Sequence, residues 1–148
     1  SPEPVKIIER EIIKKLVSSG NIVICAGGGG IPVVEKRGKL VGVEAVIDKD
    51  KTAERLATQI KAQELLMLTD VDAAYLDYGK KSQERIAEMT MLQAAEYLGK
   101  NEFAAGSMKP KIVSAMRFVK DGGKRAIITS TKMSERALNG KEGTVVKR

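Results

Sequence analysis

The stretch from Val43 to Lys51 constrains the fold of this chain most strongly, because it changes character within a few residues. The apolar run Ala45-Val46-Ile47 is typical of a buried strand, and the charged run Asp48-Lys49-Asp50-Lys51 follows it at once. Apolar residues then recur at helical spacing, at Ala53, Leu56, Ala57 and Ile60. In α/β proteins, ligands bind outside the carboxyl ends of the strands. Because lysine opposes the helix dipole in a first turn, its presence there indicates an anionic ligand.

Strand and helix patterns alternate along most of the chain. We expect helices over Lys6–Ser18, from Asp50 to near Ala62, between Thr90 and Gly99, between Ser107 and Gly122, and over Ser134–Leu138. Buried strands are expected over Asn21–Ala26 and Ala45–Ile47, and further strands over Val33–Glu35, Leu40–Val43, Glu64–Leu68, Arg125–Thr129 and Thr144–Val146. The segment Ala73–Arg85 is weakly patterned and reads as a loop, with or without a small hairpin. The alternation predicts an α/β fold, a three-layer αβα sandwich with a mainly parallel central sheet.

Length and composition set bounds on the class of protein. A chain of 148 residues with 43% hydrophobic residues is expected to form a single globular domain over residues 1–148. No apolar run approaches the roughly 20 residues that span a bilayer, and no secretory signal is visible, so we expect no membrane partner. The lone Cys25 fits a cytoplasmic setting. The chain begins at Ser1 without an initiator methionine, so we expect a fragment or a processed product.

Charge and aromatic content exclude some functions. The net charge of +7 allows a polyanionic partner, but the basic residues are interleaved with acidic ones. Two phenylalanines, three tyrosines and no tryptophan are too few for an evident base-stacking platform, so we expect no nucleic-acid partner. The sequence has no histidine, which excludes histidine-based catalysis and histidine-ligated metal sites.

Four consecutive glycines, Gly27, Gly28, Gly29 and Gly30, form the first candidate site. Glycine allows a ligand to approach the backbone closely, and successive N–H groups can cradle an anion. The run lacks the Gly-Lys-Ser/Thr of a Walker A loop, and Pro32 and β-branched residues follow where a Rossmann fingerprint would begin a helix. The run is therefore either a binding loop or a tight connection between strands.

Two lysine-bearing helix starts form the other candidates. At Asp48-Lys49-Asp50, one interpretation is a lysine that neutralises phosphoryl charge beside an orienting carboxylate, and the other is a capping aspartate with a solvated lysine. The segment Gly106–Lys111 leads a glycine into a helix whose first turn carries two lysines. This is either a phosphate site at a helix N-terminus or a basic helix start in a lysine-rich protein. Together the three candidates indicate a multiply charged anion such as a nucleotide polyphosphate.

These motifs, in this order and spacing, resemble those of carbamate kinases in the amino acid kinase superfamily. The resemblance rests on Gly27–Val33, Glu44–Asp50, Leu68–Val71 and Gly106–Lys111, and on the ends Ser1–Pro4 and Gly140–Thr144. It implies transfer of the ATP γ-phosphoryl group to carbamate, giving ADP and carbamoyl phosphate reversibly and with Mg²⁺. It also implies the ATP-forming direction in arginine fermentation.

The resemblance implies a role for individual residues. Lys49 would contact the transferring phosphoryl group, Asp50 would orient the lysines around it, and Lys111 would hold the nucleotide phosphates. Gly106 and Met108 would belong to the nucleotide site, together with Thr69, Asp70, Val71 and Tyr75, and the glycines Gly27 to Gly30 would line the acceptor side. The resemblance implies no metal-ligating side chain in this chain.

Members of the family are about twice as long, so the chain resembles their C-terminal, nucleotide-binding half. The N-terminal half would then be a partner, and the full-length protein a homodimer. We expect the isolated chain to be nearly inactive and to leave apolar surface bare. Another amino acid kinase, a carbamoyl-phosphate-forming relative and a non-catalytic nucleotide-binding or assembly module remain alternatives.

Overall fold

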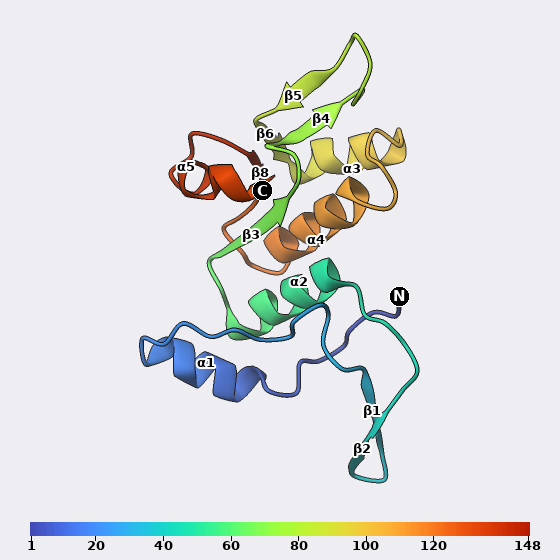
Figure 1. The fold of residues 1–148 in the computed structure, drawn as a ribbon, viewed down its shortest axis with the longest axis vertical. Helices are drawn as coiled ribbons and strands as arrows, with labels where there is room; N and C mark the ends of the chain where they lie inside the picture. Colours follow the sequence, from blue (N-terminus) through green and yellow to red (C-terminus); the bar gives the residue numbers. More distant parts are fainter. The chain divides into compact units, whose positions relative to one another are not determined.

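A computed structural model describes residues 1–148, and the chain divides into two compact units, Ser1–Ile60 and Lys61–Arg148. Figure 1 gives the course of the chain and the labels of its elements. No helix has the length and apolar character required to cross a membrane.

The first unit contains two packed helices and one hairpin. Helix α1 (Arg10–Ser18) packs against α2 (Lys49–Ile60), and the side chains of Ile13 and Ala57 are buried. The Gln59 side chain ties the segment before α1 to α2, because its Oε1 accepts a hydrogen bond from the Ile7 backbone N–H at 2.9 Å. Compared with the predicted bounds, helix α1 begins four residues later and α2 ends two residues earlier.

The first unit contains a hairpin whose two strands match the strands predicted over Val33–Glu35 and Leu40–Val43 to within one residue. Strands β1 (Val33–Lys36) and β2 (Lys39–Gly42) pair antiparallel, with Lys36 opposite Lys39. Arg37 and Gly38 form the turn with φ of 51° and 75°. Positive φ at both central residues is the signature of a type I′ turn, whose twist matches the flanking strands.

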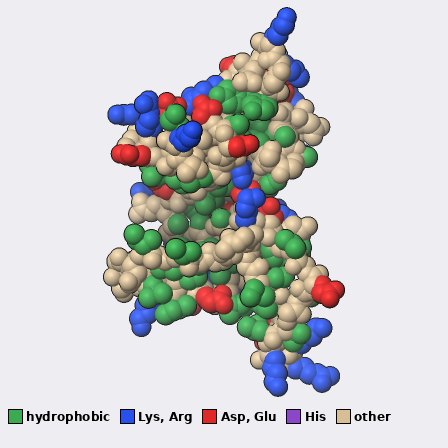
Figure 2. All heavy atoms as spheres, in the orientation of Figure 1, with side chains coloured by type: hydrophobic (Ala, Val, Ile, Leu, Met, Phe, Trp, Pro, Cys, Tyr) green, Lys and Arg blue, Asp and Glu red, His purple; other side chains and the backbone are tan.

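Two predicted strands of the first unit are wrong. Residues 21–26 and 45–47 form no strand, and the side chains of Ile22, Ile24 and Val46 are 99%, 97% and 80% exposed. Their apolar pattern is typical of buried strands, but a strand needs a neighbour for its backbone hydrogen bonds, and these segments pair with no other strand of the chain. The expected bare apolar surface is confirmed, and Figure 2 shows hydrophobic side chains gathered over this unit, in the lower part of the view.

The second unit is built on a four-stranded sheet in the order β3-β7-β8-β6. The strands are β3 (Glu64–Thr69), β7 (Arg125–Ser130), β8 (Thr144–Lys147) and β6 (Glu88–Thr90). Strand β3 runs parallel to β7 and β6 parallel to β8, while β7 and β8 are antiparallel. The sheet is therefore mixed and mainly parallel, which confirms the predicted fold class. Strand β6 was not predicted.

Helices cover both faces of this sheet. Helices α3 (Met91–Gly99) and α4 (Met108–Lys120) lie on one face, and α5 (Ser134–Leu138) lies on the other (Figure 1). The short helix η1 (Thr131–Met133) leads into α5 and contacts it. Ile112, Ala115, Phe118 and Val119 of α4 are at most 1% exposed, as are Ala126, Ile127 and Ile128 of β7. Helix α4, which was predicted between Ser107 and Gly122, thus makes the main helical contribution to the core. The three layers match the predicted αβα arrangement.

A second hairpin extends from the second unit. Strands β4 (Ala74–Leu76) and β5 (Glu84–Ile86) pair antiparallel, with Tyr75 opposite Arg85. The weak pattern of this segment predicts a loop with or without a small hairpin, and the structure shows the hairpin. Three-residue strands carry too little alternation to be recognised from a pattern alone.

Candidate functional site

The start of α2 is organised by Asp48. Its Oδ1 accepts hydrogen bonds from the backbone N–H groups of Asp50 (2.9 Å) and Lys51 (3.1 Å), which is the contact of a helix N-cap. Lys49 is the first residue of α2 and its side chain is exposed. These contacts match the interpretation of a capping aspartate with a solvated lysine. They also leave the Lys49 ammonium at a helix N-terminus, where phosphate groups bind readily.

Asp50 and Lys51 complete this first turn. Asp50 is only 7% exposed, and a carboxylate is favoured at a helix N-terminus by the helix dipole. Lys51 is tied to the start of the chain, because its Nζ lies 2.7 Å from a carboxylate oxygen of Glu3 and 3.0 Å from the Ser1 carbonyl oxygen. The orienting role predicted for Asp50 stays a prediction.

The glycine run lies beside this helix start within the first unit. Gly27, Gly28 and Gly30 are exposed, whereas Gly29 is buried and its carbonyl oxygen accepts a 2.8 Å hydrogen bond from the Thr52 hydroxyl of α2. A Cβ on Gly29 would overlap the backbone of Ile47, the residue before Asp48. The structure therefore brings together two of the candidate sites, and the close approach of two backbones explains one of the four glycines.

The second unit carries a pocket at the carboxyl end of β3, with a volume of about 110 Å³. The end of β3, the hairpin strand β4 and the start of α4 all contribute to it. Its lining comprises Thr69, Asp70, Val71, Ala73, Tyr75, Tyr78, Glu102, Phe103, Ala104, Ser107 and Met108. This position, outside the carboxyl end of a parallel strand, is where α/β folds bind ligands.

Five of the predicted nucleotide residues line this one pocket: Thr69, Asp70, Val71, Tyr75 and Met108. Gly106 and Lys111 are not among the lining residues. Gly106 directly precedes Ser107 in the lining, and Lys111 is a residue of α4 that is only 5% exposed. A lysine is seldom buried to this extent without a partner.

Sequence reasoning missed other residues of the lining, above all Tyr78 and Glu102. Tyr78 follows β4 in the hairpin, and its ring centroid lies 5.9 Å from that of Tyr75 at a tilt of 49°. Glu102 and its neighbours lie in the loop that leads into α4. The one sequence signal for Glu102 and its neighbours as site residues is their position just before the predicted lysine-bearing helix start.

Hydrogen bonds shape the polar side of the pocket. The Thr69 hydroxyl donates to Asp70 Oδ1 at 3.0 Å, and the Tyr75 hydroxyl donates to Asp72 Oδ1 at 2.8 Å. The hydrogen bond to Asp72 is the main cause that raises the pKa of Tyr75 above its ordinary value of 10.0, and burial and the Asp72 charge add to it. Tyr75 therefore remains a neutral, hydrogen-bonded ring at neutral pH.

The charge pattern at the start of α4 favours an anion over a cation. Its first turn has no acidic residue, and Lys109 and Lys111 follow Met108. Ser107 occupies the N-cap position, but its hydroxyl makes no capping hydrogen bond. A pocket walled by tyrosine and methionine beside such a helix start suits a flat aromatic ring joined to an anionic group.

Comparison with known proteins gives the family context. The sequence model of the amino acid kinase family matches residues 1–130. The chain is 51% identical to the carbamate kinase of Halobacterium salinarum over 99% of its own length and 48% of that relative. It is 47% identical to the carbamate kinase of Thermoplasma acidophilum, over 100% of the chain and 48% of the relative.

Solved structures give the same picture. The carbamate kinase from Giardia lamblia bound to AMP-PNP superposes with a TM-score of 0.97 at 39% sequence identity, over 100% of this chain and 52% of that one. The chain thus spans about half the length of the relatives it matches.

Proposed function

The chain belongs to the amino acid kinase family, and we propose that it is the nucleotide-binding half of a carbamate kinase. The enzyme transfers the γ-phosphoryl group of ATP to carbamate and gives ADP and carbamoyl phosphate in a reversible reaction. The observation that carries this proposal is the sequence identity with a carbamate kinase: 51% over 99% of the chain. Another amino acid kinase is the alternative.

The pocket of the second unit is the proposed nucleotide site. The rings of Tyr75 and Tyr78 offer stacking surface to a purine, and Met108 offers a polarisable apolar contact. Thr69, Asp70 and Val71 would lie beside the ribose, since Thr69 is the last residue of β3 and the other two come directly after it. The phosphates would extend to the start of α4, where Gly106 allows a close approach and Lys111 supplies charge.

The start of α2 is the proposed phosphoryl-transfer element of the first unit. Phosphoryl transfer asks little covalent chemistry of a protein and depends on positioning and charge neutralisation. The exposed Lys49 ammonium would neutralise the transferring group, and the buried Asp50 carboxylate would hold the surrounding charges in place. The exposed glycines Gly27, Gly28 and Gly30 would line the acceptor side beside this helix start.

Magnesium fits this site without a dedicated protein cage. Mg²⁺ keeps several waters and binds through substrate phosphates with one or two carboxylates at most. Bound to the nucleotide, it would neutralise charge on the phosphates. Asp70 and Glu102 are the two carboxylates that line the pocket, and they would lie beside such a complex.

The whole protein is proposed to be a cytoplasmic homodimer that works in arginine metabolism and contains a further N-terminal half. The 148-residue chain alone should then turn over poorly, since loss of even one charge-stabilising donor costs about 10² to 10³ in rate. An assay that couples ATP formation from carbamoyl phosphate and ADP tests this. Turnover of the isolated chain at rates typical of kinases, about 1–100 per second, would contradict the half-site proposal.

Nucleotide binding is tested separately by calorimetric titration of the chain with ATP. We expect Lys111→Ala and Lys49→Ala each to weaken binding about tenfold or more, because each removes a charge-assisted contact to phosphate. Lys120→Ala is the matched control, since Lys120 is an exposed lysine in the last turn of α4. Unchanged affinity in both test variants would remove the phosphate-site proposal.

The acceptor is tested on the full-length enzyme. Carbamate should be phosphorylated in preference to amino acid carboxylates. Preference for an amino acid acceptor would assign the protein to another branch of the family.

A further inference from the structure

Tyr75 forms one wall of the pocket, and a single hydrogen bond fixes the far end of its ring. The residue lies on β4 and its ring packs at a tilt against that of Tyr78. Its hydroxyl donates to Asp72 Oδ1 at 2.8 Å. The hydroxyl oxygen lies on the axis about which the ring turns, so this contact fixes the direction in which the ring points, and the packing against Tyr78 limits its rotation about that axis.

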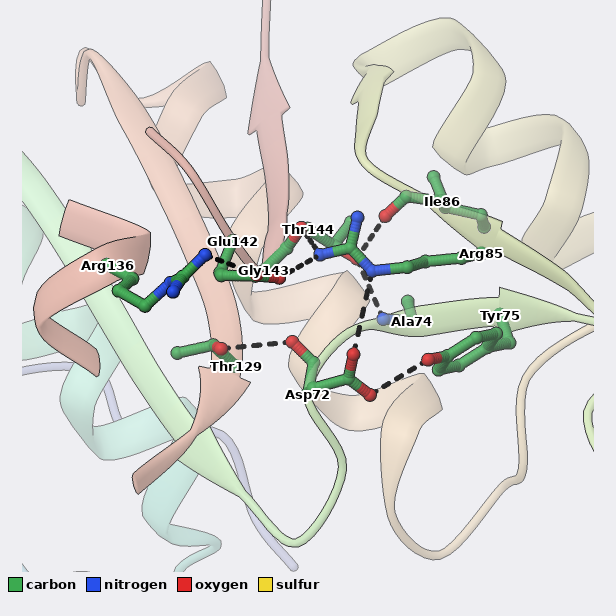
Figure 3. Close-up of polar contacts among 10 residues, drawn as sticks. All are labelled: Asp72, Ala74, Tyr75, Arg85, Ile86, Thr129, Arg136, Glu142, Gly143 and Thr144. Carbon is green, nitrogen blue, oxygen red and sulfur yellow. Dashed lines mark hydrogen bonds and ion pairs between the residues drawn. The ribbon is translucent and has the colours of Figure 1, made fainter. Parts of the chain in front are cut away.

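Asp72 is itself held from two sides, as Figure 3 shows. Its backbone carbonyl accepts a 3.0 Å hydrogen bond from the Thr129 hydroxyl at the end of β7. Its other carboxylate oxygen, Oδ2, lies 3.6 Å from the Nε of Arg85 on β5. The backbone and the carboxylate of Asp72 are thus both tied to neighbouring strands.

Arg85 carries this contact on to the loop before β8. Its Nη2 lies 2.9 Å from Glu142 Oε2 and also donates to the Gly143 carbonyl oxygen at 3.4 Å. Glu142 Oε1 in turn lies 3.2 Å from Nη2 of Arg136 on α5. The planar guanidinium of Arg85 therefore bridges two carboxylates that are far apart in the sequence. We call Asp72, Arg85, Glu142 and Arg136 the charge chain.

The hairpin that carries Tyr75 depends on such contacts. Strands β4 and β5 form a two-stranded sheet of their own, and a two-stranded hairpin is at best marginally stable alone. Asp72 and Arg85 are partly exposed, at 41% and 34% of their side chains, so their ion pair adds little to global stability. Its effect should be on the orientation of the groups that it joins.

We propose that Asp72 is a positioning residue for nucleotide binding, which holds the Tyr75 ring as a wall of the pocket and is itself held by Arg85 and Glu142. This inference rests on the proposed function, because it takes the pocket to be the nucleotide site. Asp72 is not among the residues that line the pocket. It acts through the Tyr75 hydroxyl.

A spectroscopic signature reports the contact independently of any ligand. The Asp72 carboxylate raises the pKa of Tyr75 chiefly by accepting its hydrogen bond, while the nearby Arg85 charge opposes the shift. Asp72→Asn removes the negative charge and the stronger acceptor, so the pKa of Tyr75 should fall. Tyrosinate absorbance during alkaline titration, assigned by NMR of the Tyr75 ring, measures this change.

The experiment combines that titration with calorimetric binding of ADP to the chain. Asp72→Asn should weaken ADP binding about tenfold, the size expected for loss of a hydrogen bond to a charged group. Asp121→Asn is the matched control, because Asp121 is an exposed carboxylate at the C-cap of α4 and should change neither readout. Glu142→Gln should lower affinity by a smaller factor, since it loosens Arg85 without touching Asp72.

A double-mutant cycle with Tyr75→Phe isolates the route of action. If Asp72 works through the Tyr75 hydroxyl, Asp72→Asn has no further effect on ADP affinity once that hydroxyl is gone. Additive losses, or full ADP affinity in Asp72→Asn despite a lowered pKa of Tyr75, would overturn the positioning role and leave the proposed function intact. Absence of ADP binding in the unaltered chain, with Tyr75 still responding to Asp72→Asn, would overturn both.

Discussion

Gly29 lies directly against Ile47, so close that a Cβ on Gly29 would overlap the carbonyl oxygen of Ile47. The backbone of Gly29 also has φ of 145°, a region that side-chain-bearing residues rarely adopt. Its carbonyl oxygen accepts the hydroxyl hydrogen bond of Thr52. This contact joins the glycine run to the first turn of α2 and makes Gly29 a structural requirement, whatever the neighbouring glycines bind.

Gly29→Ala should therefore lower the free energy of unfolding by about 1–3 kcal/mol, from the strained backbone and the overlap together. Gly28→Ala is the matched control, because a Cβ there would meet no atom within 4 Å. Chemical denaturation of the two variants measures the difference. Equal losses in both would contradict the close approach.

The buried Thr144 hydroxyl fastens both strands of the β4–β5 hairpin to the sheet. It accepts a 2.7 Å hydrogen bond from the Ala74 backbone N–H and donates to the Ile86 carbonyl oxygen, and Thr144 is 0% exposed. Thr144→Val keeps the shape but leaves both backbone groups unsatisfied, so it should cost about 1–3 kcal/mol of unfolding free energy. Thr144→Ser keeps the hydroxyl and should lose less. Hydrogen exchange of the Ala74 amide should quicken only in Thr144→Val.

Two helix starts differ in how they are capped. The Thr90 hydroxyl accepts from the Gln93 backbone N–H while the Gln93 side chain accepts from the Thr90 backbone N–H, which is a complete capping box. Thr90→Ala should cost about 1 kcal/mol of unfolding free energy. Ser107→Ala should change stability little, because the Ser107 hydroxyl makes no capping bond. Thermal unfolding compares the two, and a larger loss in Ser107→Ala would contradict the difference in capping.

The sequence predicted those features that depend on local chemistry. The two strands on either side of Arg37 and Gly38, the helix that begins after Thr90 and the bounds of α5 follow from neighbouring residues, and the structure has all three. Five pocket residues came from motif resemblance rather than from spacing.

The parallel sheet was expected from the alternation of strands and helices, but particular long-range contacts were missed. Strand β6 is defined only by its parallel pairing with β8, which is distant in the sequence. The contact of Arg85 with Glu142 joins residues 57 positions apart, and no local pattern marks it. The strand predicted over residues 21–26 is the opposite case, a predicted element that is not there. The local pattern indicates a strand, but the chain supplies no neighbouring strand for it to pair with.

The bare apolar segment of the first unit should make the isolated chain self-associate. Ile22 and Ile24 are almost fully exposed, and the segment that carries them pairs with no strand of the chain. Unpaired backbone beside exposed apolar side chains can bind other chains in the same way as an open sheet edge. Light scattering over a range of concentrations should show oligomers, and replacing both isoleucines by serine should shift the chain towards monomer. Leu92→Ser is the control, because Leu92 is 81% exposed on α3 and has no such unpaired backbone beside it. A monodisperse monomer at every concentration would mean that this segment recruits no second chain.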